Sequence, residues 1–244
     1  MAVLQARRSQ TPATVAVLLV AIALLAWIVT VGRMRGMDAG PGTDLGGLGW
    51  FVGIWVTMMA AMMLPSALPM ALAFTRAAEE RTGGPALVPA AVFACGYLAA
   101  WTAYGLVAYA CFRALEVLAG GVLAWDRAGP YVAGVAVLAA GAYQLTPLKE
   151  ACLRHCRTPL FFFLHRWRDG RLGALRMGAE HGAYCVGCCW GLMLALFALG
   201  VMSLFWTAVV AAVIFAEKVF PQGMRLRFLL AAGLLFLGLW QMTL

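Results

Sequence analysis

Three cysteines and a histidine lie close together in this chain, at His181, Cys185, Cys188 and Cys189. Their spacings of three and four residues place all four on one stripe of an α-helix, because a helix makes one turn in about 3.6 residues. Thiolate and imidazole groups bind soft or borderline metals such as Cu(I) and Zn(II), whereas hard cations prefer oxygen ligands. The pattern therefore predicts a metal site on one face of a helix.

A second cysteine pair and further side chains could complete the coordination shell. Cys152 and Cys156 are one turn apart if their segment is helical, and His155 lies between them. Met193 follows Cys189 by one turn, and its thioether would favour Cu(I) over Zn(II). We therefore include all of these side chains among the predicted ligands.

Glu217 is an acidic residue in an apolar stretch, where a carboxylate is costly unless it is paired inside the protein. We expect it to face the interior of the helix bundle, as a metal ligand or as an acceptor for His181 or Lys149. The adjacent Lys218 points about 100° away on a helix. We expect its ammonium group to reach back to the membrane surface.

A run of methionines precedes two prolines and offers thioether ligands. The methionines are Met58, Met59, Met62 and Met63, and the prolines are Pro65 and Pro69. Each proline removes a backbone hydrogen bond, which predicts a kink or an opening in this helix. Two interpretations stay open, a methionine-lined path for Cu(I) and flexible apolar packing.

The cysteines also have a purely structural interpretation. Cysteine is small and often buried, and Gly187 and Gly191 form a small-xxx-small pair that permits close helix contact. The cysteines near these glycines could simply extend that smooth face. Their clustering with His181 favours metal ligands over packing.

The composition indicates where such a site must be built. Of the 244 residues, 64% are hydrophobic and 11% are charged, and the mean hydropathy is +0.88. This excludes an ordinary water-soluble domain and predicts an all-α, polytopic transmembrane helix bundle that forms one domain over residues 1–244. A helix needs about 20 apolar residues to cross a bilayer. Seven such spans can be placed, at 13–32, 50–74, 86–112, 130–148, 183–202, 203–220 and 227–244.

The basic residues predict how the bundle is oriented. With seven spans, fourteen of the 18 Lys and Arg residues fall on the side of the N-terminus, and positively charged loops stay in the cytoplasm. The N-terminus is therefore expected in the cytoplasm and the C-terminus outside. The net charge of +8 then faces anionic headgroups, so the expected partners are the lipid bilayer and a metal ion, and no nucleic acid.

The longest connection, at residues 149–182, is basic and rich in aromatic residues. We expect it in the cytoplasm or the headgroup region, with its rings toward the lipid and its guanidinium groups toward water. On this topology the predicted ligands of several segments point to the same side. The sequence thus predicts one multi-helix Cys/His/Met site near the cytoplasmic face.

Three stretches resemble the signatures of a bacterial family described as predicted metal-binding integral membrane proteins of unknown function. They are residues 55–65, 143–159 and 184–193, within a resemblance that runs from about residue 50 to Lys218. The resemblance implies a multi-pass, metal-binding protein of the bacterial inner membrane. The signature positions that it carries over are Met58, Met59, Met62, Met63, Pro65, Gln144, Lys149, Cys152, Cys156, Cys185, Cys188, Cys189 and Glu217.

Three functions are compatible with these residues. The first is the handling of Cu(I), with Zn(II) as the alternative metal, by transport or by delivery to a copper-dependent membrane enzyme or another membrane subunit. The second is a thiol-disulfide oxidoreductase in which Cys185 and Cys188 exchange electrons with Cys152, Cys156 and a quinone. The third is a structural subunit of a membrane complex. Only three histidines are present, and the ten acidic residues are mostly in loops, so the sequence does not favour a hydrolytic site.

Overall fold

The computed structural model describes residues 2–35, 45–119, 129–201, 203–220 and 223–243, and these residues form helices and no strand. The helices within them are α1 (Ala2–Met34), α2 (Leu48–Thr82), α3 (Leu87–Ala119), α4 (Gly129–Gln144), α5 (Pro147–Arg157), α6 (Pro159–Arg166), α7 (Gly170–Gly200), α8 (Leu204–Val219) and α9 (Gly223–Gln241). The predicted all-α class is confirmed. Two predicted connections, around residues 36–44 and 120–128, lie outside the described residues.

Several of these helices are long and apolar enough to cross a membrane. In the described part of the chain they are Gln10–Met34, Leu48–Thr82, Leu87–Ala114 and Gly170–Gly200, and the pair Pro130–Gln144 and Pro147–Arg157, bent by 65°, could form one more crossing. α8 has 16 residues and the apolar part of α9 is Leu226–Gln241, both shorter than the ~20 residues that a bilayer core takes. The structure therefore has fewer full-length candidate spans than the predicted seven, because the last two helices are short.

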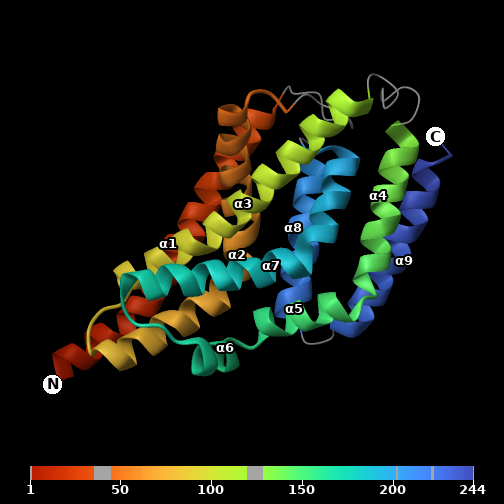
Figure 1. The fold of residues 1–244 in the computed structure, drawn as a ribbon. Coiled ribbons are helices and arrows are strands. Elements are labelled where there is room, and N and C mark those ends of the chain that lie inside the picture. Colours follow the sequence, from red (N-terminus) through yellow and green to blue (C-terminus); the bar gives the residue numbers. More distant parts are fainter. Residues whose placement is uncertain (1, 36–44, 120–128, 202, 221–222, 244) are drawn as a thin grey trace.

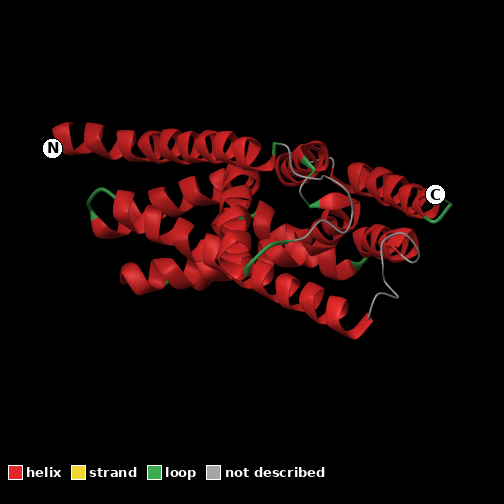
Figure 2. Cartoon of the chain, turned by 90° about the horizontal axis from the view of Figure 1, so that it is seen from above, coloured by secondary structure: helices red, strands yellow, loops and turns green. Residues whose placement is uncertain are grey.

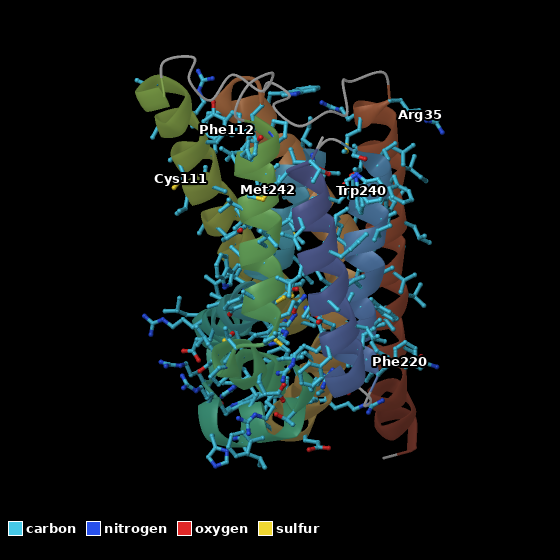
Figure 3. The ribbon with its side chains drawn as sticks, turned by 90° about the vertical axis from the view of Figure 1, so that its right-hand side faces the viewer. Arg35, Cys111, Phe112, Phe220, Trp240 and Met242 are labelled. Carbon is cyan, nitrogen blue, oxygen red and sulfur yellow. The ribbon has the colours of Figure 1, made fainter. Side chains whose placement is uncertain are left out.

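The helices form an elongated bundle with two distinct ends (Figure 1). α1 begins at the end where α6 lies, and α9 ends at the other. Seen from above, α1 runs along one edge (Figure 2). Figure 3 shows Arg35, after α1, and Met242, after α9, at the same end, whereas Phe220, after α8, lies toward the opposite one. α8 therefore runs against α1 and α9, which agrees with termini on opposite sides.

Glycines bring α3 and α7 together, and this pair makes the most extensive helix contact in the described bundle. A Cβ on Gly182 would lie 2.7 Å from the Cβ of Ala100 and 2.8 Å from the carbonyl oxygen of Tyr97. The backbone of Phe93 leaves equally little room at Gly178. Only glycine permits this approach. As a result, the side chains of Phe93 and Tyr97 are held against the middle of α7.

α7 is longer than the sequence predicts. It begins at Gly170, within the segment expected at the membrane surface, so the predicted start near residue 183 is wrong. At its N-terminal end the helix thus extends beyond the apolar residues. It ends at Gly200, whose φ of +107° favours glycine, and α8 begins after the N-cap Ser203. The predicted boundary between the spans 183–202 and 203–220 is confirmed.

α2 carries the methionine run and remains one helix through both prolines. The prolines therefore do not break this helix, and the predicted kink stays a prediction. The carbonyl of Met63 accepts a hydrogen bond from the Ser66 hydroxyl at 2.9 Å and lies 3.5 Å from the Tyr97 hydroxyl of α3. These contacts set the end of the methionine run beside α3.

Candidate metal centre

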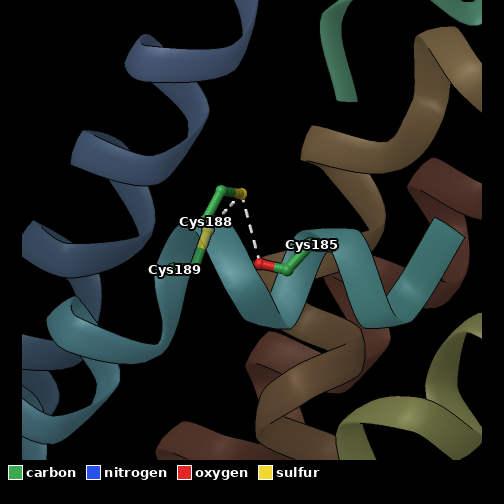
Figure 4. Close-up of side chains that lie close together, drawn as sticks. All are labelled: Cys185, Cys188 and Cys189. Carbon is green, nitrogen blue, oxygen red and sulfur yellow. Dashed lines mark hydrogen bonds between the residues drawn. The ribbon is translucent and has the colours of Figure 1, made fainter. Parts of the chain in front are cut away.

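Three cysteine sulfurs meet on the buried face of α7. The Sγ atoms of Cys185, Cys188 and Cys189 all lie within 4.8 Å of one another, and each side chain is at most 1% exposed. Cys188 Sγ lies 3.3 Å from Cys189 Sγ and donates to the Cys185 carbonyl at 3.2 Å (Figure 4). Three sulfurs at this spacing can bind one soft metal ion. Among the described residues, no other group of three or more Cys, His, Asp or Glu side chains is close enough to do so.

A fourth sulfur comes from α5. Cys156 Sγ lies 3.8 Å from Cys188 Sγ. The side chain of Thr146 caps the start of α5. At the other end of this helix, Arg157 donates to the carbonyl of Glu217 at 2.8 Å and so ties α5 to α8. α5 is thereby held with its last turn against α7, and the predicted convergence of Cys156 with the cysteines of α7 is confirmed.

Cys185 has two polar partners from other helices. Its Sγ lies 2.9 Å from Lys218 Nζ of α8 and 3.0 Å from the Tyr97 hydroxyl of α3. Lys218 also donates to the Ser66 hydroxyl of α2 at 3.0 Å. The expectation that Lys218 reaches back to the membrane surface is therefore wrong, because two acceptors inside the bundle hold its ammonium group. A cation beside a sulfur stabilises the thiolate, which is the form that binds metal.

Sequence reasoning misses Tyr97 and Ser66 as parts of this site. Each carries a hydroxyl on a mostly apolar helix, and both helices also carry other hydroxyl groups that do not reach the site. Neither residue is related to Cys185 by a helical spacing, because all three lie on different helices. Their convergence is a property of the packed bundle.

Glu217 is paired with Lys149 deep in the bundle. Both carboxylate oxygens lie 2.8 Å from Lys149 Nζ, and the two side chains are 2% and 1% exposed. Lys149 also donates to the side-chain oxygen of Gln144. The predicted pairing of Glu217 with Lys149 is confirmed, and a role of Glu217 as a metal ligand stays a prediction.

Two glycines of α7 face α5 and α4. A Cβ on Gly187 would be 2.7 Å from Cys152 Sγ, and one on Gly191 would be 3.1 Å from the Tyr143 ring. At about 100° per residue, Gly187 is roughly opposite Cys185 on the helix. Cys185 thus lies off the glycine face, whereas Cys188 precedes Gly191 by one turn, so the packing interpretation stays open for Cys188. Cys152 packs on the glycine face, and its role as a ligand stays a prediction.

His155 lies on α5 between the two cysteines of that helix. Its Nδ1 is 2.9 Å from the carbonyl of Ala151, and its ring stacks on Tyr184 with centroids 4.3 Å apart. One ring nitrogen therefore has a backbone partner already. Metal binding by His155 stays a prediction.

The predicted thioether ligands are all buried. Met58, Met59, Met62, Met63 and Met193 are each at most 2% exposed. Met63 is the one whose backbone contacts Tyr97, a partner of Cys185. Both interpretations of the methionine run, a copper path and apolar packing, remain compatible with this burial.

His181 lies one helical turn before Cys185, outside the group of three sulfurs. Its side chain is 2% exposed, and its ring stacks near those of Phe93 and Tyr97, with centroids 6.1 and 5.5 Å away. Its Nδ1 has no hydrogen-bond partner among the described residues. The three cysteines of the predicted stripe on α7 therefore meet, but the His181 ring packs among aromatic rings and not among their sulfurs.

These features define an all-helical, apolar protein with a buried cysteine cluster that could hold a metal ion. A model of the PpoB2 family, described as a copper chaperone, matches residues 52–241. The match covers most of the chain and every candidate ligand, so the chain belongs to this copper chaperone family. No curated protein and no solved structure matches the chain.

Proposed function

We propose that this protein is a membrane-embedded copper chaperone that binds Cu(I) with the sulfurs of Cys185, Cys188 and Cys189. The observation that carries the proposal is the spacing of these buried sulfurs, all within 4.8 Å of one another. Membership of a copper chaperone family supports copper as the metal. Three thiolates in an apolar environment suit a soft monovalent ion of low coordination number, whereas a structural Zn(II) site needs four ligands and would have to include Cys156 as well.

Cys156 provides the means of releasing the metal. It lies on α5, is half-buried, and its Sγ is 3.8 Å from that of Cys188. A fourth thiol can replace one of the three by ligand exchange, so the copper stays bound while it moves toward the edge of the site. The recipient would be a copper-dependent membrane enzyme or another membrane subunit that offers ligands of the same kind.

We assign the protein to the bacterial inner membrane, with the N-terminus and the metal site on the cytoplasmic side. Four helices of sufficient length and apolarity support a multi-pass protein, and the distribution of Lys and Arg supports the orientation. The cytoplasm is reducing and keeps thiols available for Cu(I). All seven cysteines are free, as such a site requires.

Metal analysis of the purified protein tests the proposal. Under anaerobic, reducing conditions in detergent, we expect tightly bound, stoichiometric copper by ICP mass spectrometry and a sulfur-only coordination shell by X-ray absorption. The variant C185S/C188S/C189S should lose this copper. Cys95 and Cys111 of α3 are exposed, so C95S/C111S is a matched control that should keep it. Equal copper content in the triple variant and the unmodified protein would overturn the proposal.

Thiol-disulfide exchange is the second candidate function, and the contact between Cys156 and Cys188 favours it. Their sulfurs are 3.8 Å apart, and a disulfide bond of about 2.05 Å would need only a small shift of α5. Trapping of thiols in intact cells, followed by mass mapping, separates the two functions. A reversible Cys156 to Cys188 disulfide supports the oxidoreductase, whereas free thiols under all growth conditions support the chaperone.

A further inference from the structure

His181 presents a buried nitrogen that lacks a partner. The side chain is 2% exposed, and Nδ1 makes no hydrogen bond within the described part of the chain. Burial of an imidazole nitrogen in this state is unfavourable, because the nitrogen gives up its hydrogen bonds to water and gains none in return. Such an atom in a native protein calls for a partner, and a bound ion is one that can satisfy it.

Three aromatic rings hold this imidazole in place. Phe93 and Tyr97 stack on it with interplanar angles of 21° and 23°, and Phe162 meets it edge-on at a centroid distance of 6.1 Å. A ring packed in this way cannot swing its nitrogen out to water. These apolar rings therefore exclude water from the imidazole without supplying a hydrogen-bond partner for Nδ1.

Met177 adds a second donor one helical turn earlier on α7. Its side chain is 1% exposed, and positions 177 and 181 share a face of the helix. Helical side chains lean toward the N-terminus, so the side chain of His181 extends over the turn that carries Met177. An imidazole nitrogen and a thioether sulfur are both uncharged. This pair of donors selects a soft monovalent ion over Zn(II) or a hard cation.

We propose that Met177 and His181 form a second, weaker Cu(I) site that loads the thiol cluster, an inference that rests on the proposed function. Along α7, buried side chains recur every four residues at Met177, His181, Cys185, Cys189 and Met193, with steps of about 6 Å. Copper at His181 therefore needs to move by one turn to reach the cysteines. Its bonds to Nδ1 and to the thioether break as bonds to the cysteine thiolates form, and the ion stays Cu(I) throughout.

The position of the second site sets its place in the sequence of events. Met177 lies closer than His181 to the N-terminal end of α7, and Cys185 lies further along the helix. Copper that enters from that end meets two neutral donors before it meets the thiolates. Neutral donors hold Cu(I) less tightly than thiolates do, so each step along the helix is downhill in free energy.

The first test removes the thiol cluster and titrates what remains with Cu(I). We expect C185S/C188S/C189S to bind Cu(I) weakly, with nitrogen and sulfur neighbours by X-ray absorption, and the addition of H181F to abolish this binding. H165F is the matched control, because His165 is exposed and its Nδ1 lies 3.0 Å from the carbonyl of Phe161. If the triple variant binds no Cu(I), or binds it equally with H181F, the second site does not exist.

The second test keeps the cysteines and measures how fast they are loaded. Stopped-flow absorption at the thiolate-to-copper band should show loading slowed by about tenfold or more in M177L and H181F, with the final amount of thiol-bound copper unchanged. M177L conserves volume and so guards against a folding defect. Unchanged rates, or loss of the thiol-bound copper itself, would overturn the inference. A wild-type protein without thiol-bound copper would instead contradict the proposed function.

Discussion

Glu217 and Lys218 are neighbours at the end of α8, yet their charges have different surroundings. Glu217 is enclosed, with both carboxylate oxygens 2.8 Å from Lys149 Nζ and its carbonyl bonded to Arg157. Lys218 has an acceptor of another kind, because its Nζ lies 2.9 Å from Cys185 Sγ. One charge is matched by a second permanent charge, and the other faces an atom that can bind metal.

This difference separates the parts of the molecule that maintain the fold from those that serve the site. The pair of Glu217 and Lys149 neutralises itself and joins α8 to α5. In the proposed site, Lys218 would instead balance the negative charge of several thiolates that share one ion. The sulfur of Cys185 is fully buried, and charges interact more strongly where the dielectric constant is low.

The largest effect, on the free energy of unfolding, should follow from breaking the ion pair of Glu217 and Lys149. E217Q leaves the ammonium of Lys149 buried without a counter-charge, and loss of one partner of a buried pair costs about 3–5 kcal/mol. We expect the free energy of unfolding, measured by reversible unfolding in mixed detergent micelles, to fall by that amount. The double variant K149M/E217L removes both charges and should recover most of the loss. Equal losses in the single and double variants would show that the pair does not act as a unit.

A smaller effect on stability but a clear effect on copper is expected from K218M. Without the ammonium, the negative charge of the copper-bound thiolates has no counter-charge, so the affinity for Cu(I) should fall by about tenfold, or ~1.4 kcal/mol. Competition with a chromophoric Cu(I) chelator measures this affinity. K218R keeps the charge and should retain more of the affinity than K218M. If both variants bind copper as tightly as the unmodified protein, Lys218 does not serve the site.

Helical spacing is the reason that part of the site could be predicted from sequence. Cys185, Cys188 and Cys189 share a face because the period of the helix determines which residues do. Their meeting with Cys156 followed from topology, since the end of one segment and the start of the next lie on the same side. The all-α class followed from the composition for a similar reason, because the bilayer permits few alternatives to helices.

The parts that could not be predicted depend on contacts between helices. Two adjacent residues such as Glu217 and Lys218 differ by about 100° around the helix, and the sequence does not say which acceptors await each of them. The start of α7 at Gly170 was missed because hydropathy reports the apolar part of a helix and not its length. The approach of Tyr97 depends on Gly178 and Gly182, whose role is visible only once α3 and α7 are packed.

Removal of the Tyr97 hydroxyl should lower the affinity for Cu(I) moderately, because this hydroxyl contacts Cys185, the same sulfur that Lys218 contacts. Y97F loses the 3.0 Å contact with Cys185 Sγ, and such a bond contributes about 1 kcal/mol. We expect the affinity for Cu(I) to fall by about fivefold, measured by the same chelator competition, with little change in unfolding. Y109F is the control, because the Tyr109 hydroxyl donates to the carbonyl of Gly46 and not to a cysteine. An equal loss of affinity in Y109F would make the effect nonspecific.

The smallest effect should come from Ser66, which touches the site only through Lys218. S66A removes an acceptor 3.0 Å from Lys218 Nζ, but the ammonium keeps its contact with Cys185 and is only half-buried, so water can take the place of the hydroxyl. We expect copper affinity to change by no more than about twofold. A change as large as that of K218M would mean that the hydroxyl positions the ammonium over the sulfur. The position of the Lys218 ammonium would then depend on α2, just as the ion pair of Glu217 depends on Lys149 of α5.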